Sequence, residues 1–145
     1  MRFHEEQHGV YFDDLDPFRI LHNARYLLIM ERTIGSLWHH LGWRPIGDGN
    51  HDPDQDHLVR AQDISYEVPV QGTGRVRCRI WVEHLGRTSL QFGFQILPMD
   101  EDTPHCRGHR TLVRIDADTR EAVPWSDEFR VRIRPYRRDT DPPAA

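Results

Sequence analysis

The sequence predicts an α+β fold in which a five-stranded antiparallel sheet wraps around one long central helix. One segment repeats apolar residues at the spacing of a helix, and it is long enough for about five turns. One strand-like segment precedes this helix and four follow it, and the apolar stripe is wide enough that a sheet must curl to bury it. With 145 residues the chain has the size of one domain. We therefore expect a single domain over 1–145, with its core at about 8–134 and a polar tail.

Before the helix, the chain is expected to form one short strand and a turn. Residues 10–12 (VYF) have the composition of a strand, and the acidic run 13–17 (DDLDP) ends it. Pro17 biases Asp16 away from the helical region and towards an extended conformation. Asp16 is therefore predicted to lie in a turn just ahead of the helix.

The central helix is predicted over 24–41. Its apolar stripe consists of residues spaced by threes and fours, namely Leu27, Met30, Ile34, Leu37, Trp38 and Leu41. Asn23 is a suitable N-cap, and Gly42 lies just past the predicted end.

The second half of the chain is predicted to be mostly strands. A polar loop over 44–57 is followed by four stretches with strand character, at 58–68, 75–84, 88–97 and 106–116. We expect them to pair as an antiparallel meander, with Ser126 capping a short helix after it. Some strand edges stay open in this arrangement, so two copies are expected to pair them, as a homodimer or homotetramer.

The composition excludes several classes of function. The net charge is −4, which does not indicate a nucleic-acid partner. All 19 basic residues are arginines, so lysine Schiff-base chemistry is excluded. No apolar stretch is long enough to cross a bilayer, and the first ten residues lack the apolar run of a signal peptide. We therefore expect a cytoplasmic protein that does not associate with membranes.

Neither metal-like pattern in the sequence is convincing. Asp52, Asp54 and Asp56 have the odd-numbered spacing of a calcium loop, but His57 stands where that loop needs glycine. A disordered acidic loop is the better interpretation. A second group, 105–109, contains two histidines and a cysteine but lacks a fourth zinc ligand. No metal and no cofactor is therefore expected.

The segment FDDLDPFRILHNARYLLIMER, residues 12–32, resembles the signature of the 4-hydroxybenzoyl-CoA thioesterase family within the hot-dog superfamily. That signature is D-x-D, a short turn, an asparagine near the start of the central helix and an aromatic residue three positions later. Here these are Asp14, Asp16, Asn23 and Tyr26. The resemblance implies the hot-dog fold.

A second block supports the same resemblance. ISYEVPV, residues 64–70, is similar to the family's strand end, and residues 82–96 are similar to its strand hairpin. The likeness spans about residues 8–130. The family's turn after D-x-D usually contains a glycine, whereas this chain has Phe18 and Arg19. We therefore expect a turn made without glycine's freedom at positive φ, and an altered acyl pocket.

The resemblance implies the catalytic roles. Asp16 aligns with the catalytic carboxylate, and the backbone amide of Asn23 aligns with the donor that polarises the thioester carbonyl. A carboxylate can attack the carbonyl carbon or activate a water molecule, and these two roles remain open. A helix N-terminus supplies unpaired amides that stabilise the developing oxyanion. On local sequence alone, an ordinary turn residue is the better interpretation of Asp16.

Four further residues are candidates for substrate binding: His22, Tyr26, Glu31 and Arg87. His22 is otherwise a polar residue at the helix start, and Tyr26 is part core and part pocket wall. Glu31 is also the rival catalytic carboxylate, because some hot-dog thioesterases place their acid on this helix. Arg87 lies in the hairpin region where the family binds CoA phosphates, but it is equally an ordinary turn arginine.

The sequence thus predicts an acyl-CoA thioesterase that releases a free acid and CoA. Two alternatives remain open. One is a thioesterase that acts on an acyl-carrier protein in a fatty-acid or polyketide pathway. The other is a non-catalytic acyl-CoA-binding module on the same fold. The identity of the acyl group is not specified by the sequence.

Overall fold

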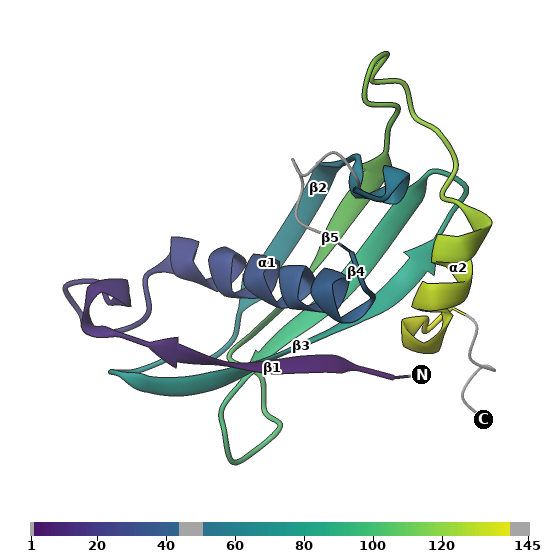
Figure 1. Ribbon diagram of the computed structural model, residues 1–145. Helices are drawn as coiled ribbons and strands as arrows, with labels where there is room; N and C mark the ends of the chain where they lie inside the picture. Colours follow the sequence, from purple (N-terminus) through teal and green to yellow (C-terminus); the bar gives the residue numbers. More distant parts are fainter. Residues whose placement is uncertain (1, 44–50, 140–145) are drawn as a thin grey trace.

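Five strands form one antiparallel sheet in the order β1-β3-β4-β5-β2 in the computed structural model, which describes residues 2–43 and 51–139. The strands are β1 (His4–Val10), β2 (His57–Tyr66), β3 (Gly74–Leu85), β4 (Ser89–Leu97) and β5 (Cys106–Arg114). The helix α1 (Asn23–His40) lies across one face of this sheet (Figure 1). The five-stranded antiparallel sheet with a helix packed against it is therefore confirmed.

A second helix, α2 (Asp127–Ile133), contributes to the cover of the sheet. It lies beyond the C-terminal end of α1 (Figure 1), where Phe129 packs against Trp38 and Trp43. Ser126 caps it as predicted, because its Oγ accepts a hydrogen bond from the Phe129 amide at 3.1 Å. Two helices rather than one therefore cover this face.

The strand order differs from a simple meander at β2. Strands β3, β4 and β5 pair in chain order, but β2 pairs with β5 at the far edge of the sheet. β1 forms the opposite edge, against β3. Chain order does not reveal this, because an edge strand is chosen by long-range pairing. Two edge strands are thus left with one partner each.

The prediction of a strand over 10–12 was wrong. The strand is β1, and Phe12–Asp14 forms a 3₁₀ helix. The inward side chains of β1 before Val10 are polar, so they give no strand signal: His4 and His8 lie 2.8 Å from the hydroxyls of Ser36 and Thr33 on α1. Hydrogen bonds to α1 here replace the usual apolar contacts.

The helix α1 begins and ends with recognisable caps, although Asn23 is not the N-cap as predicted. His22 takes that position, and its Nδ1 accepts a hydrogen bond from the Ala24 amide at 3.1 Å. At the other end Gly42 has φ of +90°, and the Trp43 amide donates to the Trp38 carbonyl at 3.0 Å. This is a Schellman motif, in which glycine's left-handed conformation ends the helix.

The acidic segment before β2 is ordered from residue 51, so the prediction of a disordered loop was wrong there; residues 44–50 lie outside the described part. Asp54 is buried and accepts hydrogen bonds from the Ser126 amide and hydroxyl, at 2.9 and 2.5 Å. It thereby ties this loop to the start of α2. Among the described residues, no helix is long and apolar enough to cross a membrane.

Candidate active site

The turn from Asp16 to Ile20 is closed by the carboxylate of its own first residue. Asp16 Oδ1 accepts hydrogen bonds from the amides of Phe18 and Ile20, at 2.8 and 3.3 Å. The Asp16 amide donates to the Ile20 carbonyl at 2.9 Å. Asp16 Oδ2 has no hydrogen-bond partner among residues 2–43 and 51–139. One carboxylate oxygen therefore holds the turn, and the other is available for chemistry.

Arg19 stands in this turn with φ of +62°. The turn is made without glycine, and an arginine adopts the left-handed conformation that glycine would take. That conformation costs a residue with a side chain about 1–2 kcal/mol. The turn is held from outside, since the Gly72 amide donates to the Arg19 carbonyl and the Leu21 amide donates to the Val70 carbonyl, both at 2.9 Å. These contacts offset the strain and fix Asp16 relative to residues 70–72.

The first turn of α1 presents a free amide. The amides of Ala24 and Arg25 donate to the ring nitrogen and the carbonyl of His22. The Asn23 amide has no acceptor among the described residues. A free N–H at a helix start carries the partial positive charge of the helix dipole, and this charge favours a developing oxyanion.

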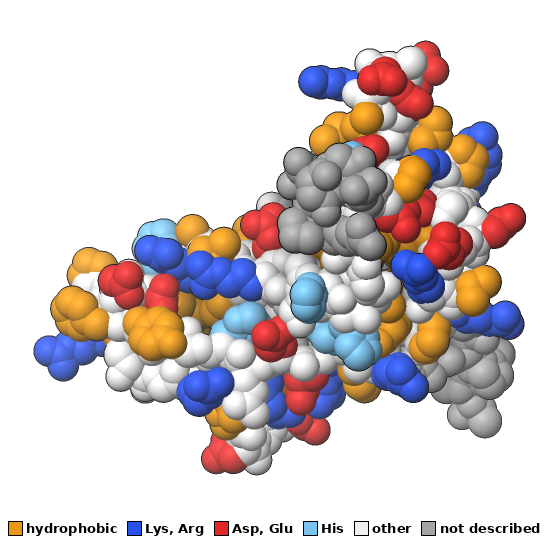
Figure 2. Space-filling view, in the orientation of Figure 1, with side chains coloured by type: hydrophobic (Ala, Val, Ile, Leu, Met, Phe, Trp, Pro, Cys, Tyr) orange, Lys and Arg blue, Asp and Glu red, His pale blue; other side chains and the backbone are white. Residues whose placement is uncertain are grey.

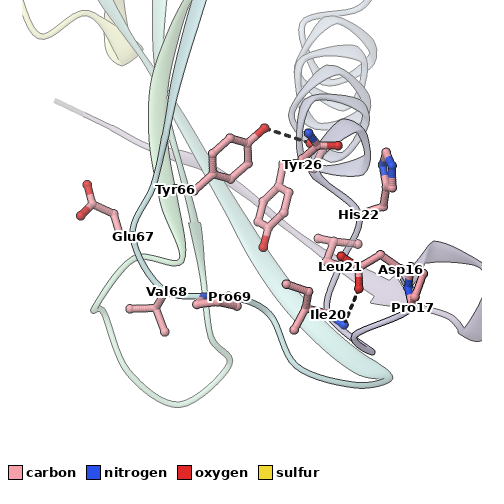
Figure 3. Close-up of a pocket in the computed structure, with 11 residues that line it drawn as sticks. Asp16, Pro17, Ile20, Leu21, His22, Tyr26, Tyr66, Glu67, Val68 and Pro69 are labelled. Atoms are coloured by element: carbon pink, nitrogen blue, oxygen red, sulfur yellow. Dashed lines mark hydrogen bonds between the residues drawn. The ribbon is translucent and has the colours of Figure 1, made fainter.

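The turn, the helix start and the end of β2 enclose a cavity of about 610 Å³. Its lining combines the predicted residues with a segment that follows β2, and comprises Asp16, Pro17, Ile20, Leu21, His22, Asn23, Tyr26, Tyr66, Glu67, Val68 and Pro69. Most of this lining is apolar or aromatic. Figure 3 shows the Asp16 carboxylate turned towards Ile20, and His22 on the opposite side of the helix start from Tyr66. Four of the predicted site residues are thus brought to one cavity.

Two tyrosines form one wall of the cavity. Tyr26 is buried, and its hydroxyl accepts a hydrogen bond from the Val70 amide at 3.2 Å. Burial raises the pKa of this hydroxyl above its ordinary value, so the group stays neutral and can act as a donor. The Tyr66 ring meets the Tyr26 ring edge-on, with centroids 5.1 Å apart.

Tyr66 and Glu67 are cavity residues to which the sequence analysis gave no role. The only signal was the 64–70 segment, which was interpreted as evidence for the fold. Glu67 is a second carboxylate of the cavity lining, and its Oε1 lies 3.2 Å from Arg107 Nε. Asp16 has no such ion pair among the described residues.

Glu31 and Arg87 do not line this cavity. Glu31 lies further along α1 and accepts a hydrogen bond from Arg110 at 2.9 Å. Arg87 follows the far end of β3, where its carbonyl accepts hydrogen bonds from the Trp125 amide and the Arg130 guanidinium, both at 3.0 Å. Within this chain, neither residue therefore shares the cavity with Asp16.

Other chemistries find little support in the described part of the chain. Burial raises the pKa of the Cys78 and Cys106 thiols to about 12, so neither supplies a thiolate nucleophile at neutral pH. No group of three or more histidine, cysteine, aspartate or glutamate residues is arranged to hold a metal ion there. Asp16 and the Asn23 amide, which both belong to the cavity lining, are therefore the candidates for its reactive groups.

Comparisons with known proteins agree with this fold. A family model described as the thioesterase-like superfamily matches residues 10–133. No curated protein has a significantly matching sequence.

Among solved structures, a predicted thioesterase from Bacillus stearothermophilus is 16% identical, with a TM-score of 0.81 over 93% of this chain and 96% of that one. A 1,4-dihydroxy-2-naphthoyl-CoA thioesterase from Synechocystis is 13% identical, with a TM-score of 0.78 over 98% and 100%. A thioesterase complexed with coenzyme A and Zn from Thermus thermophilus is 22% identical, with a TM-score of 0.75 over 91% and 92%. At these identities the likeness shows a shared fold.

Proposed function

The chain belongs to the thioesterase-like superfamily, and on that premise we propose that it hydrolyses an acyl-CoA thioester to a free acid and CoA. The proposal assigns it to the 4-hydroxybenzoyl-CoA thioesterase type within that superfamily. One observation carries the proposal: a carboxylate with a free oxygen and a free helix-start amide line the same cavity. Thioester hydrolysis needs these two groups together.

In the proposed reaction, the carbonyl oxygen of the thioester accepts a hydrogen bond from the Asn23 amide. Asp16 Oδ2 then attacks the carbonyl carbon, or removes a proton from a water molecule that attacks it. The carbon–sulfur bond breaks and CoA leaves as a thiolate, which takes up a proton from Asp16 if Asp16 has activated a water molecule, and from the solvent if Asp16 has attacked directly. If Asp16 attacks, water hydrolyses the resulting anhydride and restores the carboxylate. In both routes the amide stabilises the oxyanion that develops on the carbonyl oxygen.

CoA is the proposed carrier for two reasons. One of the similar structures is of a thioesterase for a CoA ester and another is of a thioesterase complexed with coenzyme A, and the described cavity lining contains no group specific for another leaving group. An acyl-carrier protein would present the same phosphopantetheine thioester. Turnover of one acyl group on both carriers separates these substrates.

A homodimer is part of the proposal. The edge strand β2 has ten residues, and nearly all are exposed on both faces, including Leu58 and Val59. Such an edge favours pairing with a second chain. Since β2 ends at Tyr66 in the cavity lining, that pairing would bring the partner close to the site. Light scattering with the strand-blocking substitution Val59→Pro tests this part.

The decisive experiment is a hydrolysis screen over acyl-CoA chain types with wild type and Asp16→Asn. The substitution keeps an oxygen that can accept from Phe18 and Ile20, so the turn is retained and the charge is lost. Turnover is expected to fall about 10²- to 10⁴-fold, the usual contribution of a catalytic acid or base. Glu67→Gln is the matched control, because it removes a negative charge from the same lining.

Each outcome assigns the chemistry. Loss in Asp16→Asn with near-wild-type turnover in Glu67→Gln supports the proposal. Unchanged turnover in Asp16→Asn would refute it, and Glu31→Gln then tests the rival carboxylate on α1. Tight acyl-CoA binding without turnover in wild type would instead indicate a binding module.

A further inference from the structure

Two tyrosines form hydrogen bonds across the cavity, one from α1 to the segment after β2 and the other from the end of β2 to α1. Tyr26 reaches from α1 to the Val70 amide, and Tyr66 reaches from the last position of β2 to the helix. The Tyr66 hydroxyl donates a hydrogen bond to the Asn23 carbonyl at 3.1 Å (Figure 3). The first residue of α1 is therefore held directly by a side chain of the edge strand.

Tyr66 has features that its packing alone does not require. Its side chain is half exposed, at the end of a strand with one partner. A ring that only filled the core would be buried, as the Tyr26 ring is. Its hydroxyl is nevertheless engaged, and the acceptor belongs to the residue whose amide is the proposed oxyanion donor.

The same contact affects the orientation of that amide. The N–H and C=O of Asn23 are attached to one Cα, and the helix fixes the angle between them. A restraint on the carbonyl therefore restrains the amide at the first position, where an α-helix is otherwise free to fray. A preorganised donor needs no rearrangement as charge develops on the substrate oxygen.

We propose that Tyr66 is a positioning residue for the proposed hydrolysis: its hydroxyl aims the Asn23 amide, and its ring forms the cavity wall against the acyl group. This inference rests on the proposed function. Tyr66 acts through Asn23 and takes no part in proton transfer. Its ring keeps Tyr26 in place through their edge-to-face contact, a geometry that aromatic pairs favour.

Three variants separate the hydroxyl from the ring. Tyr66→Phe removes only the hydrogen bond and is expected to lower kcat about 5- to 10-fold with KM unchanged, the effect of one neutral hydrogen bond. Tyr66→Ala also removes the wall and is expected to raise KM. Tyr11→Phe is the matched control, because Tyr11 is exposed on the loop before Asp16 and does not belong to the cavity lining.

A double-mutant cycle that combines Tyr66→Phe with Asn23→Pro distinguishes positioning of the Asn23 amide from a purely structural role of Tyr66. That substitution deletes the Asn23 amide hydrogen. If Tyr66 acts by aiming this hydrogen, Tyr66→Phe causes no further loss of kcat in the Asn23→Pro background. An equal loss in both backgrounds, or wild-type kcat in Tyr66→Phe, would overturn the inference while leaving the proposed function standing. Failure of wild type to hydrolyse any thioester would overturn both.

Discussion

The backbone amide of Asn23 can be removed by a single substitution, Asn23→Pro. Asn23 is the first residue of α1, which is the helix position where proline is most readily accepted. His22 has φ of −60° and ψ of 135°, the extended conformation that a residue before proline prefers. The amide donates to no acceptor in the described part of the chain, so no protein hydrogen bond is lost.

The expected effect is a loss of catalysis without a loss of fold. Removal of one oxyanion donor costs about 2.7–4 kcal/mol, or 10²- to 10³-fold in kcat. Stability is expected to change by no more than about 1 kcal/mol, because a proline in a compatible conformation is neutral to stabilising. Urea unfolding measures the second quantity, and release of the CoA thiol measures the first.

Asn23→Ala is the control, because it removes the side chain and keeps the amide. It is expected to retain wild-type kcat. Since the proline Cδ takes the place of the amide hydrogen, inhibition by free CoA must be measured in both variants to exclude blocked binding. If Asn23→Pro is as active as Asn23→Ala, the amide is not the oxyanion donor and the proposed mechanism fails.

Three further predictions concern stability. Arg19→Gly should raise the free energy of unfolding by about 0.5–1 kcal/mol, because glycine adopts positive φ without strain, although it loses more backbone entropy on folding. Arg19→Ala keeps the strain, so an equal gain in stability from that variant would contradict this explanation. Asp54→Ala should lower the free energy of unfolding, measured in urea, by about 3 kcal/mol, because Ser126 and Arg114 lose a buried partner. A loss of stability as small as that for a surface residue would be inconsistent with the observed burial of Asp54. Burial lowers the pKa of the His57 imidazole below its ordinary 6.5, so this side chain binds a proton more tightly in the unfolded chain than in the folded one. The contribution of His57 to the free energy of unfolding is therefore complete above pH 6.5 and is lost as the pH falls below that value. His57→Phe should therefore flatten part of the decline in urea midpoint below pH 6.5, and an unchanged pH profile would exclude His57 as a cause.

The surface around the site bears on the assays. Figure 2 shows hydrophobic side chains gathered at the end of the molecule that carries the loop between β1 and α1. Phe12 and Phe18 on this loop are more than four-fifths exposed. Exposed aromatic residues of this kind favour association, so turnover and light scattering are best measured over a range of protein concentrations.

Local sequence was sufficient for features that depend on neighbouring residues. The apolar stripe of α1 and the alternation in β3 and β4 predicted those elements to within one residue at each end. Asp16 precedes the helix start by only a few residues, so a carboxylate close to the helix amides was predictable as well. The exact cap was not, because His22 and Asn23 are both able to accept from the first-turn amides and the backbone decides between them.

The sequence by itself determined that this chain has an amphipathic helix, a set of alternating strands, and an acidic turn just before the helix. Only the tertiary structure decided that β2 pairs at the far edge of the sheet, and this placement brings Tyr66 and Glu67 to the start of α1. Only the tertiary structure decided, too, that contacts with residues 70–72 hold Arg19 at positive φ. The physical reason is range. Periodicity and capping act over a few residues, whereas strand order and the walls of a cavity are set by contacts between segments about 45 residues apart, where many pairings satisfy the same local pattern.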